Sequence, residues 1–139
     1  VAIIAILAAI AIPQYETYIT KSQFTEATTV ATGMETDINL YYNQNGACPV
    51  IGDATKGKGF PSNVASYEGK YVASAIINTG TAATGNKTCD VEVTFKGTGS
   101  VSKPLTGAKV LFQGTASGGN FTWKCSSAVA DKYKPETCR

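Results

Sequence analysis

Val1-Ala-Ile-Ile-Ala-Ile-Leu-Ala-Ala-Ile-Ala-Ile12 opens the chain as twelve apolar residues in a row, and the run ends at Pro13. A membrane-spanning helix needs about 20 apolar residues, so this run is too short to cross a bilayer alone. It also lacks the positive residues that precede the apolar core of a secretory signal. A helix that is apolar on every side must be surrounded by lipid or by other apolar helices. We interpret the run as the remaining part of a longer apolar segment.

An amphipathic pattern follows the run. Apolar residues recur at intervals of three or four, with Thr, Gln and Glu between them, at Phe24, Ala27, Ala31, Met34, Ile38 and Tyr41. This spacing predicts a helix with one core-facing stripe. Pro13 and Glu16 are typical of a helix start and Asn45-Gly46 of a helix end, so Pro13 predicts a kink or break between two helical stretches. A helix that comprised all of residues 1–46 would be nearly 70 Å long at about 1.5 Å per residue. Such a helix would project beyond its own domain.

Short strand-like segments replace the helical pattern after Gly46. We expect strands at 70–78, 90–96, 108–113 and 120–125, separated by clusters of Gly, Ser, Thr and Asn. The second alternates, with Val91, Val93 and Phe95 on one side. The predicted fold class is α+β, a long N-terminal helix packed on a four-stranded antiparallel sheet. We expect residues 1–23 to protrude and residues 24–139 to form a head with a long loop at 46–69, a sheet at about 70–125 and a C-terminal loop at 125–138.

The four cysteines, Cys48, Cys89, Cys125 and Cys138, predict two disulfides. Their spacing contains no Cys-x-x-Cys, and without histidine a zinc site would need all four thiolates. Of the three possible pairings we favour Cys48–Cys89, which anchors the long loop, and Cys125–Cys138, which closes the C-terminal segment. Disulfides place the head in an oxidising compartment.

Composition excludes most catalytic chemistry. The chain has no histidine, which removes Ser-His-Asp triads, Cys-His pairs and imidazole metal ligands. Gly52–Lys58 has the Gly and Lys spacing of a phosphate-binding loop, but Gly59 replaces the required Ser or Thr. We therefore expect no enzyme activity, no cofactor and no metal. The net charge of +2 is too small to indicate specific nucleic-acid binding.

Charge differs between the two parts of the chain. Residues 1–46 hold one basic and four acidic side chains, whereas residues 47–139 hold eleven basic and six acidic ones. Our hypothesis is that the acidic helix, including Glu26 and Glu35, meets the basic head of a neighbouring subunit.

Residues 1–15 resemble the N-terminal helix of type IV pilins, and the Cys125–Cys138 segment resembles the C-terminal disulfide loop of the type IVa subclass, most like pseudomonad and acinetobacter pilins. The family pattern begins with Phe-Thr-Leu-Ile-Glu before the residues seen here, so we expect Val1 to be a trimming point. The resemblance implies a subunit held in the inner membrane, then packed by its apolar helix into a retractable surface filament of identical subunits. Adhesion, twitching motility and DNA uptake are the functions it implies, with the pilus assembly machinery as a partner.

The resemblance also assigns roles to residues. The filament core is expected to comprise Val1, Ile3, Ile4, Ile6, Leu7, Ile10, Ile12, Pro13 and Tyr15, with Tyr18 and Ile19 continuing the face. In the resembling pilins the C-terminal loop is associated with binding of host-surface receptors, which here points to Ser126, Asp131, Lys132, Tyr133, Lys134, Pro135 and Glu136. The alternative for this loop is a purely structural closure of the head. Alternatives for the whole chain are a minor tip pilin, a secretion-system pseudopilin and, least favoured, a membrane-anchored enzyme.

Overall fold

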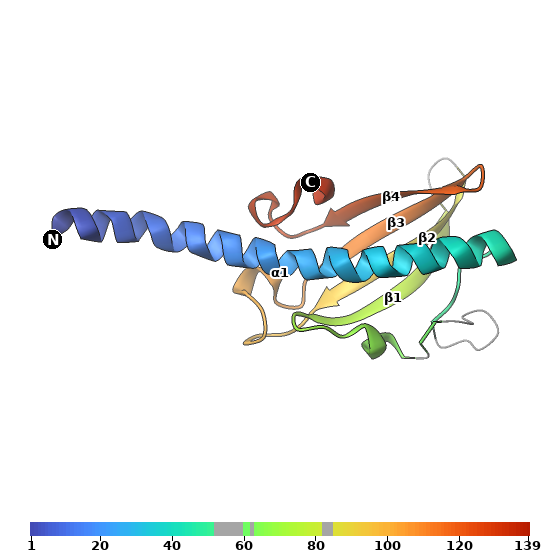
Figure 1. Cartoon of the computed structure of the whole chain (residues 1–139), viewed down its shortest axis with the longest axis horizontal. Helices are drawn as coiled ribbons and strands as arrows, with labels where there is room; N and C mark the ends of the chain where they lie inside the picture. Colours follow the sequence, from blue (N-terminus) through green and yellow to red (C-terminus); the bar gives the residue numbers. More distant parts are fainter. Residues whose placement is uncertain (52–59, 62, 82–84) are drawn as a thin grey trace.

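The computed structural model describes residues 1–51, 60–61, 63–81 and 85–139, and it contains a long helix beside a four-stranded sheet. Helix α1 (Ala2–Asn45) lies along one face of the sheet with its second half, while its first half extends beyond the sheet (Figure 1). The strands are β1 (Val72–Thr81), β2 (Lys87–Phe95), β3 (Lys109–Ser117) and β4 (Asn120–Ser127). They are antiparallel neighbours in the order β1-β2-β3-β4. The predicted α+β fold is confirmed.

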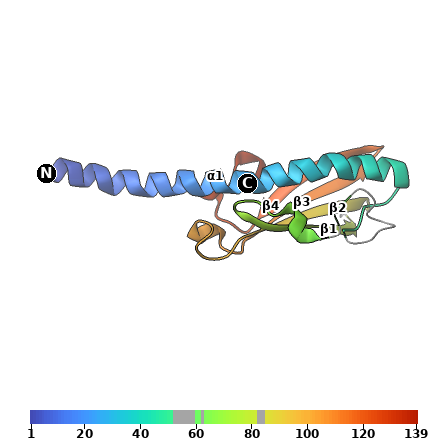
Figure 2. The ribbon, with the colours of Figure 1, turned by 60° about the horizontal axis from the view of Figure 1, so that its bottom comes forward.

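The core forms between the helix stripe and the inner face of the sheet (Figure 2). Five stripe residues are at most 1% exposed, namely Phe24, Ala27, Ala31, Met34 and Ile38. The alternation predicted for β2 is also confirmed, since Val91, Val93 and Phe95 are buried on the same side. The rings of Phe24 and Phe95 lie 5.7 Å apart between centroids. Tyr41 was expected in the stripe but is only half-buried, with its ring edge-on to Phe60.

Pro13 neither breaks the helix nor begins it, so the predicted break and helix start at Pro13 were wrong. Figure 1 shows one continuous helix, which begins at Ala2 with Pro13 inside it. Proline removes a single N–H from the helical ladder, whereas the surrounding hydrogen bonds remain available. The Thr17 hydroxyl donates to the Pro13 carbonyl at 3.0 Å. The predicted helix end is confirmed, because Gly46 adopts φ 66° and donates its N–H to the Tyr42 carbonyl.

The strands extend beyond the apolar segments that predicted them. In β1 and β2 the pairing continues through Thr79↔Cys89 and Gly80↔Thr88, and β3 and β4 pair through Thr115↔Thr122. These ends are Gly- and Thr-rich, so hydrophobic alternation does not mark them. Backbone pairing holds them in the sheet, because each added pair satisfies backbone donors and acceptors. Residues 52–58, which resemble a phosphate-binding loop, lie outside the described residues.

Glu26 joins the helix to the start of the sheet. Its carboxylate accepts three backbone hydrogen bonds, from Lys70 at 2.8 Å, Tyr71 at 2.6 Å and Val72 at 2.8 Å. A Cβ at position 69 would lie 2.6 Å from a Glu26 oxygen, so a side chain there would displace the carboxylate that accepts these bonds. This contact fixes the chain's entry into β1 against α1.

The same contact changes the charge hypothesis. Glu26 is engaged within its own subunit, so reversing its charge would disturb the fold before it reported on a neighbour. Glu35 is half-buried, and desolvation by burial raises the pKa of its carboxyl. These two carboxylates therefore serve poorly as probes of contacts between subunits.

Replacing Glu26 by Gln should destabilise the subunit. An amide would turn an N–H₂ group toward at least one backbone N–H and leave it unpaired, which costs about 1.5–3 kcal/mol. The melting temperature measured by circular dichroism should fall by roughly 5–10 °C. Glu16→Gln, on the exposed part of the same helix, is the control and should leave the melting temperature unchanged. Equal melting temperatures for both variants would contradict the role given to Glu26.

Gly114 is expected to be intolerant of alanine because it faces Trp123 across β3 and β4. A Cβ at Gly114 would lie 2.6 Å from the indole ring. Gly114→Ala should displace the ring, lower the stability and shift the emission of this single tryptophan. Gly33→Ala is the matched control, because a Cβ on this helical residue meets nothing within 4 Å. Gly33→Ala should stabilise the helix by up to about 1 kcal/mol and leave the tryptophan emission unchanged. Unchanged emission in Gly114→Ala would contradict the close contact between Gly114 and Trp123.

Candidate functional site

The exposed first half of α1 is the largest feature that the subunit leaves uncovered. Six branched apolar side chains there are 60–73% exposed, namely Ile3, Ile4, Ile6, Leu7, Ile10 and Ile12. Val1, Pro13 and Tyr15 are exposed as well. The helix contains an 18-residue window apolar enough to cross a membrane, and none of that window is buried in the subunit. Contiguous exposed apolar surface of this kind marks a site of association with protein or membrane.

Burial on α1 begins gradually as the helix meets the head. Tyr18 is 71% exposed, Ile19 is half-buried, and Thr20 is the first buried residue of the helix. Two short loops flank the helix at this level, one around the 3₁₀ turn Lys103–Leu105 and the other around the turn Asp131–Tyr133 (Figure 1). The Gln23 side-chain oxygen accepts a hydrogen bond from the Ser102 N–H at 2.7 Å. The first loop is therefore fixed to the helix.

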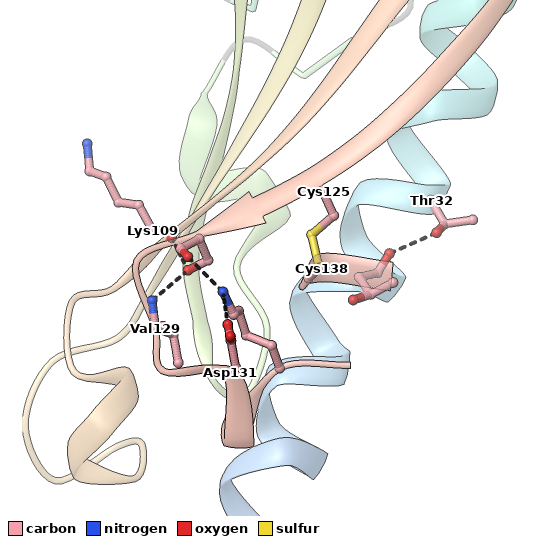
Figure 3. Close-up of a disulfide and its surroundings, with 9 residues drawn as sticks. Thr32, Lys109, Cys125, Val129, Asp131 and Cys138 are labelled. Atoms are coloured by element: carbon pink, nitrogen blue, oxygen red, sulfur yellow. Dashed lines mark hydrogen bonds and ion pairs between the residues drawn. A yellow bond between two sulfur atoms is a disulfide. The ribbon is translucent and has the colours of Figure 1, made fainter. Parts of the chain in front are cut away.

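Both predicted disulfides are present, Cys48–Cys89 and Cys125–Cys138. Cys48 follows the end of α1 and Cys89 lies in β2, so the first bond ties the chain after the helix to the sheet. The second closes the C-terminal segment onto the edge strand β4 (Figure 3). The structure thus anchors residues 46–51 and the C-terminus covalently.

The C-terminal loop is organised around a buried lysine. Lys134 is 7% exposed, and its ammonium donates to the Ser127 carbonyl at 3.1 Å and contacts Asp131 Oδ1 at 2.8 Å. The Ser127 hydroxyl donates to the Lys109 carbonyl and accepts from the Val129 N–H (Figure 3). These contacts fold the loop back on the end of β4. This structural role was not predicted, because Lys134 was expected among the binding residues.

Asp131 completes the Lys134 contact from the solvent side. The hydrogen bond from Lys134, and the attraction of its ammonium, lower the pKa of the Asp131 carboxyl. A carboxyl whose pKa is lowered by folding stabilises the folded state above its unfolded pKa, and the effect disappears as pH falls through the folded pKa. The contact is thus intact at neutral pH and is lost only in acid. Its contribution is small, because the Asp131 side chain is 75% exposed.

The predicted receptor-binding residues divide into exposed and interior members. Ser126, Asp131, Lys132 and Glu136 are exposed, whereas Tyr133 and Pro135 are half-buried and Lys134 is buried. Lys132 lies over the Tyr133 ring, 4.9 Å from its centroid. Glu136 pairs with Arg139 at the C-terminus. Any ligand of the loop would meet the exposed residues and the edge of Tyr133.

Comparison with known proteins agrees with this arrangement of helix, sheet and disulfide loop. Residues 20–139 match the family model described as pilin, a bacterial filament protein. The chain is 38% identical over 139 residues to the fimbrial protein EcpC of Eikenella corrodens, covering 100% of this chain and 83% of that protein. It is 36% identical over 153 residues to the type IV major fimbrial protein FimA of Dichelobacter nodosus, covering 100% of this chain and 88% of that protein.

A third relative is less similar in sequence. The type IV major pilin protein PilE1 of Neisseria gonorrhoeae is 29% identical over 158 residues, covering 100% of this chain and 81% of that protein. The family match and these full-length alignments fit a chain whose helix is half covered and half exposed. The chain belongs to the pilin family and is a structural subunit of a type IV pilus.

Proposed function

We propose that Val1–Tyr15 forms the core of a filament of identical subunits, and that the filament is retractable and serves adhesion, twitching motility and DNA uptake. The observation that carries this proposal is the exposure of six Ile and Leu side chains on one helix, each 60–73% exposed. An α-helix with apolar residues on every side is stable in water only when other apolar groups cover it. Copies of the same helix supply such groups without another partner.

The energetics favour near-complete burial of this helix. Covering an Ile or Leu side chain stabilises by about 1.5–3 kcal/mol, so six contribute roughly 9–18 kcal/mol. Bringing two proteins together costs about 4–15 kcal/mol. The two ranges overlap, so assembly becomes more favourable as more of the six side chains are covered, and one neighbour can lie against only one side of a helix that is apolar on every side. Repeated head-to-tail packing surrounds each helix with several neighbours and propagates an open filament.

Before assembly the same helix would hold the subunit in the inner membrane. Support comes from the 18-residue apolar window in α1, none of which is buried by the head. The two disulfides suit an extracellular head, because such bonds persist in oxidising compartments. We place the assembled protein in an extracellular pilus and its precursor pool in the inner membrane. The pilus assembly machinery would move subunits between the two.

We propose a major subunit rather than a minor tip pilin or a secretion-system pseudopilin. Two of the relatives above are named as major fimbrial or pilin proteins. The Cys125–Cys138 bond that closes the head argues against a pseudopilin. We also propose that the exposed residues of the C-terminal loop, Asp131, Lys132 and Glu136, contact surface receptors or phage.

A charge on the exposed helix should abolish filament formation. Ile6→Lys would place an ammonium among apolar helices without a partner, which is strongly unfavourable. Ile6 is 62% exposed in the subunit, so the head's melting temperature should not change. Cells expressing the variant should yield no sheared filaments by electron microscopy. Thr122→Lys on the exposed side of β4 is the matched control and should assemble; normal filaments from Ile6→Lys would refute the proposed core.

Measuring the adhesion of variant filaments distinguishes a C-terminal loop that binds receptors from one that is purely structural. Lys132→Glu changes an exposed charge without touching the Lys134 contacts, so fold and filament yield should be preserved. If the loop binds, adhesion per filament should fall at least several-fold. The double change Cys125→Ser and Cys138→Ser tests the structural alternative. Normal adhesion by Lys132→Glu, with loss only in the double variant, would show that the loop merely closes the head.

A further inference from the structure

A groove opens where α1 leaves the head, at the end of the proposed filament core. Its volume is about 370 Å³. One wall is the helix, through Tyr15, Glu16 and Ile19. The opposite wall comes from the two flanking loops, through Lys103 and Pro104 on one side and Tyr133 on the other. The groove is thus apolar and aromatic, with one carboxylate and one ammonium among its lining side chains.

The groove lies at the level of the helix where a membrane surface would meet it. Its helix wall begins three residues after Ile12, the last residue of the apolar run, which is about 4.5 Å along the helix axis. The polar headgroup layer of a bilayer adds about 5–7 Å beyond the hydrocarbon on each side. If Ile12 lies at the edge of the hydrocarbon, Tyr15 and Glu16 lie at the depth of the headgroups. Exposed tyrosines such as Tyr15 are typical of this layer.

The two charges of the groove have no protein partner of their own. Glu16 and Lys103 are exposed, and neither side chain forms an ion pair or hydrogen bond within the described part of the chain. An apolar helix from a second copy would cover both charges without pairing either, which is costly. A ligand carrying one negative and one positive group would match both.

We propose that this groove binds the headgroup of a phosphoethanolamine phospholipid while the subunit is in the membrane. Lys103 would contact the phosphate, and Glu16 would accept hydrogen bonds from the primary ammonium. Tyr15, on the hydrocarbon side of Glu16, would lie against the glycerol backbone. A choline headgroup offers no N–H donor to Glu16, and a purely anionic headgroup places a second negative charge beside it. The inference rests on the proposed membrane-held state of the subunit.

The test is lipid retention by the full chain. The protein is reconstituted into nanodiscs of equal phosphatidylethanolamine and phosphatidylcholine, and native mass spectrometry counts the lipids that remain bound. Phosphatidylethanolamine offers Glu16 N–H donors that phosphatidylcholine lacks, and one net hydrogen bond contributes about 1 kcal/mol, so phosphatidylethanolamine should be retained about fivefold over phosphatidylcholine. Glu16→Gln should reduce this preference, whereas Lys103→Gln should lower the retention of both lipids, because both carry the same phosphate. The double variant should retain little of either lipid and show no preference.

Matched controls change the same charges outside the groove. Asp37→Asn and Lys124→Gln change exposed side chains that do not line the groove and should keep the full preference. Equal retention of the two lipids by the unmodified chain would overturn the proposal, as would a preference that survives in the Glu16→Gln/Lys103→Gln double variant. If the mass spectra show pairs of chains and no lipid preference, a second copy occupies the groove, and this result would also overturn the proposal. Failure of the chain to enter nanodiscs would instead contradict the membrane-held state itself.

Discussion

The packing of one helix against one small sheet governs the rest of this structure. At about 1.5 Å per residue, the 44 residues of α1 extend roughly 66 Å. The longest strand has 10 residues, which span roughly 33 Å. A sheet of this size therefore covers about half of the helix, whatever the details of the interface. The sheet buries the stripe from Phe24 to Ile38, and the apolar side chains before Tyr15 remain exposed.

The covered half of the helix also serves as a scaffold for the ends of the sheet and its loops. Glu26 holds the start of β1 through three backbone N–H groups, and Gln23 holds the loop at Ser102 through one. Covalent bonds anchor the other ends, at Cys48 after the helix and at Cys138 beside β4. Polar contacts thus hold the helix to the head near the point where it leaves the sheet. They orient the apolar segment relative to the head.

Periodic patterns in the sequence predicted most of the fold, whereas individual polar contacts could not be predicted from the sequence. The spacing from Phe24 to Ile38, the alternation around Val93 and the four cysteines each repeat or pair in ways that one sequence reveals. Pro13 misled the prediction, because the cost of one missing hydrogen bond depends on the bonds around it. The roles of Glu26 and Lys134 depend on partners 44 and 7 residues away, and no local pattern encodes such contacts. The residues that line the groove could not be predicted from the sequence for the same reason.

The central proposal is that residues 1–12 leave solvent only by packing against other copies of themselves. A cryo-electron microscopy reconstruction of the purified filament measures this directly. We expect the apolar helices to lie at the filament axis, with Ile3, Ile6 and Ile10 contacting neighbouring subunits and the β-sheets facing outward. Helices lying on the outer surface, or a filament held together by head contacts with residues 1–12 still exposed, would contradict the proposal.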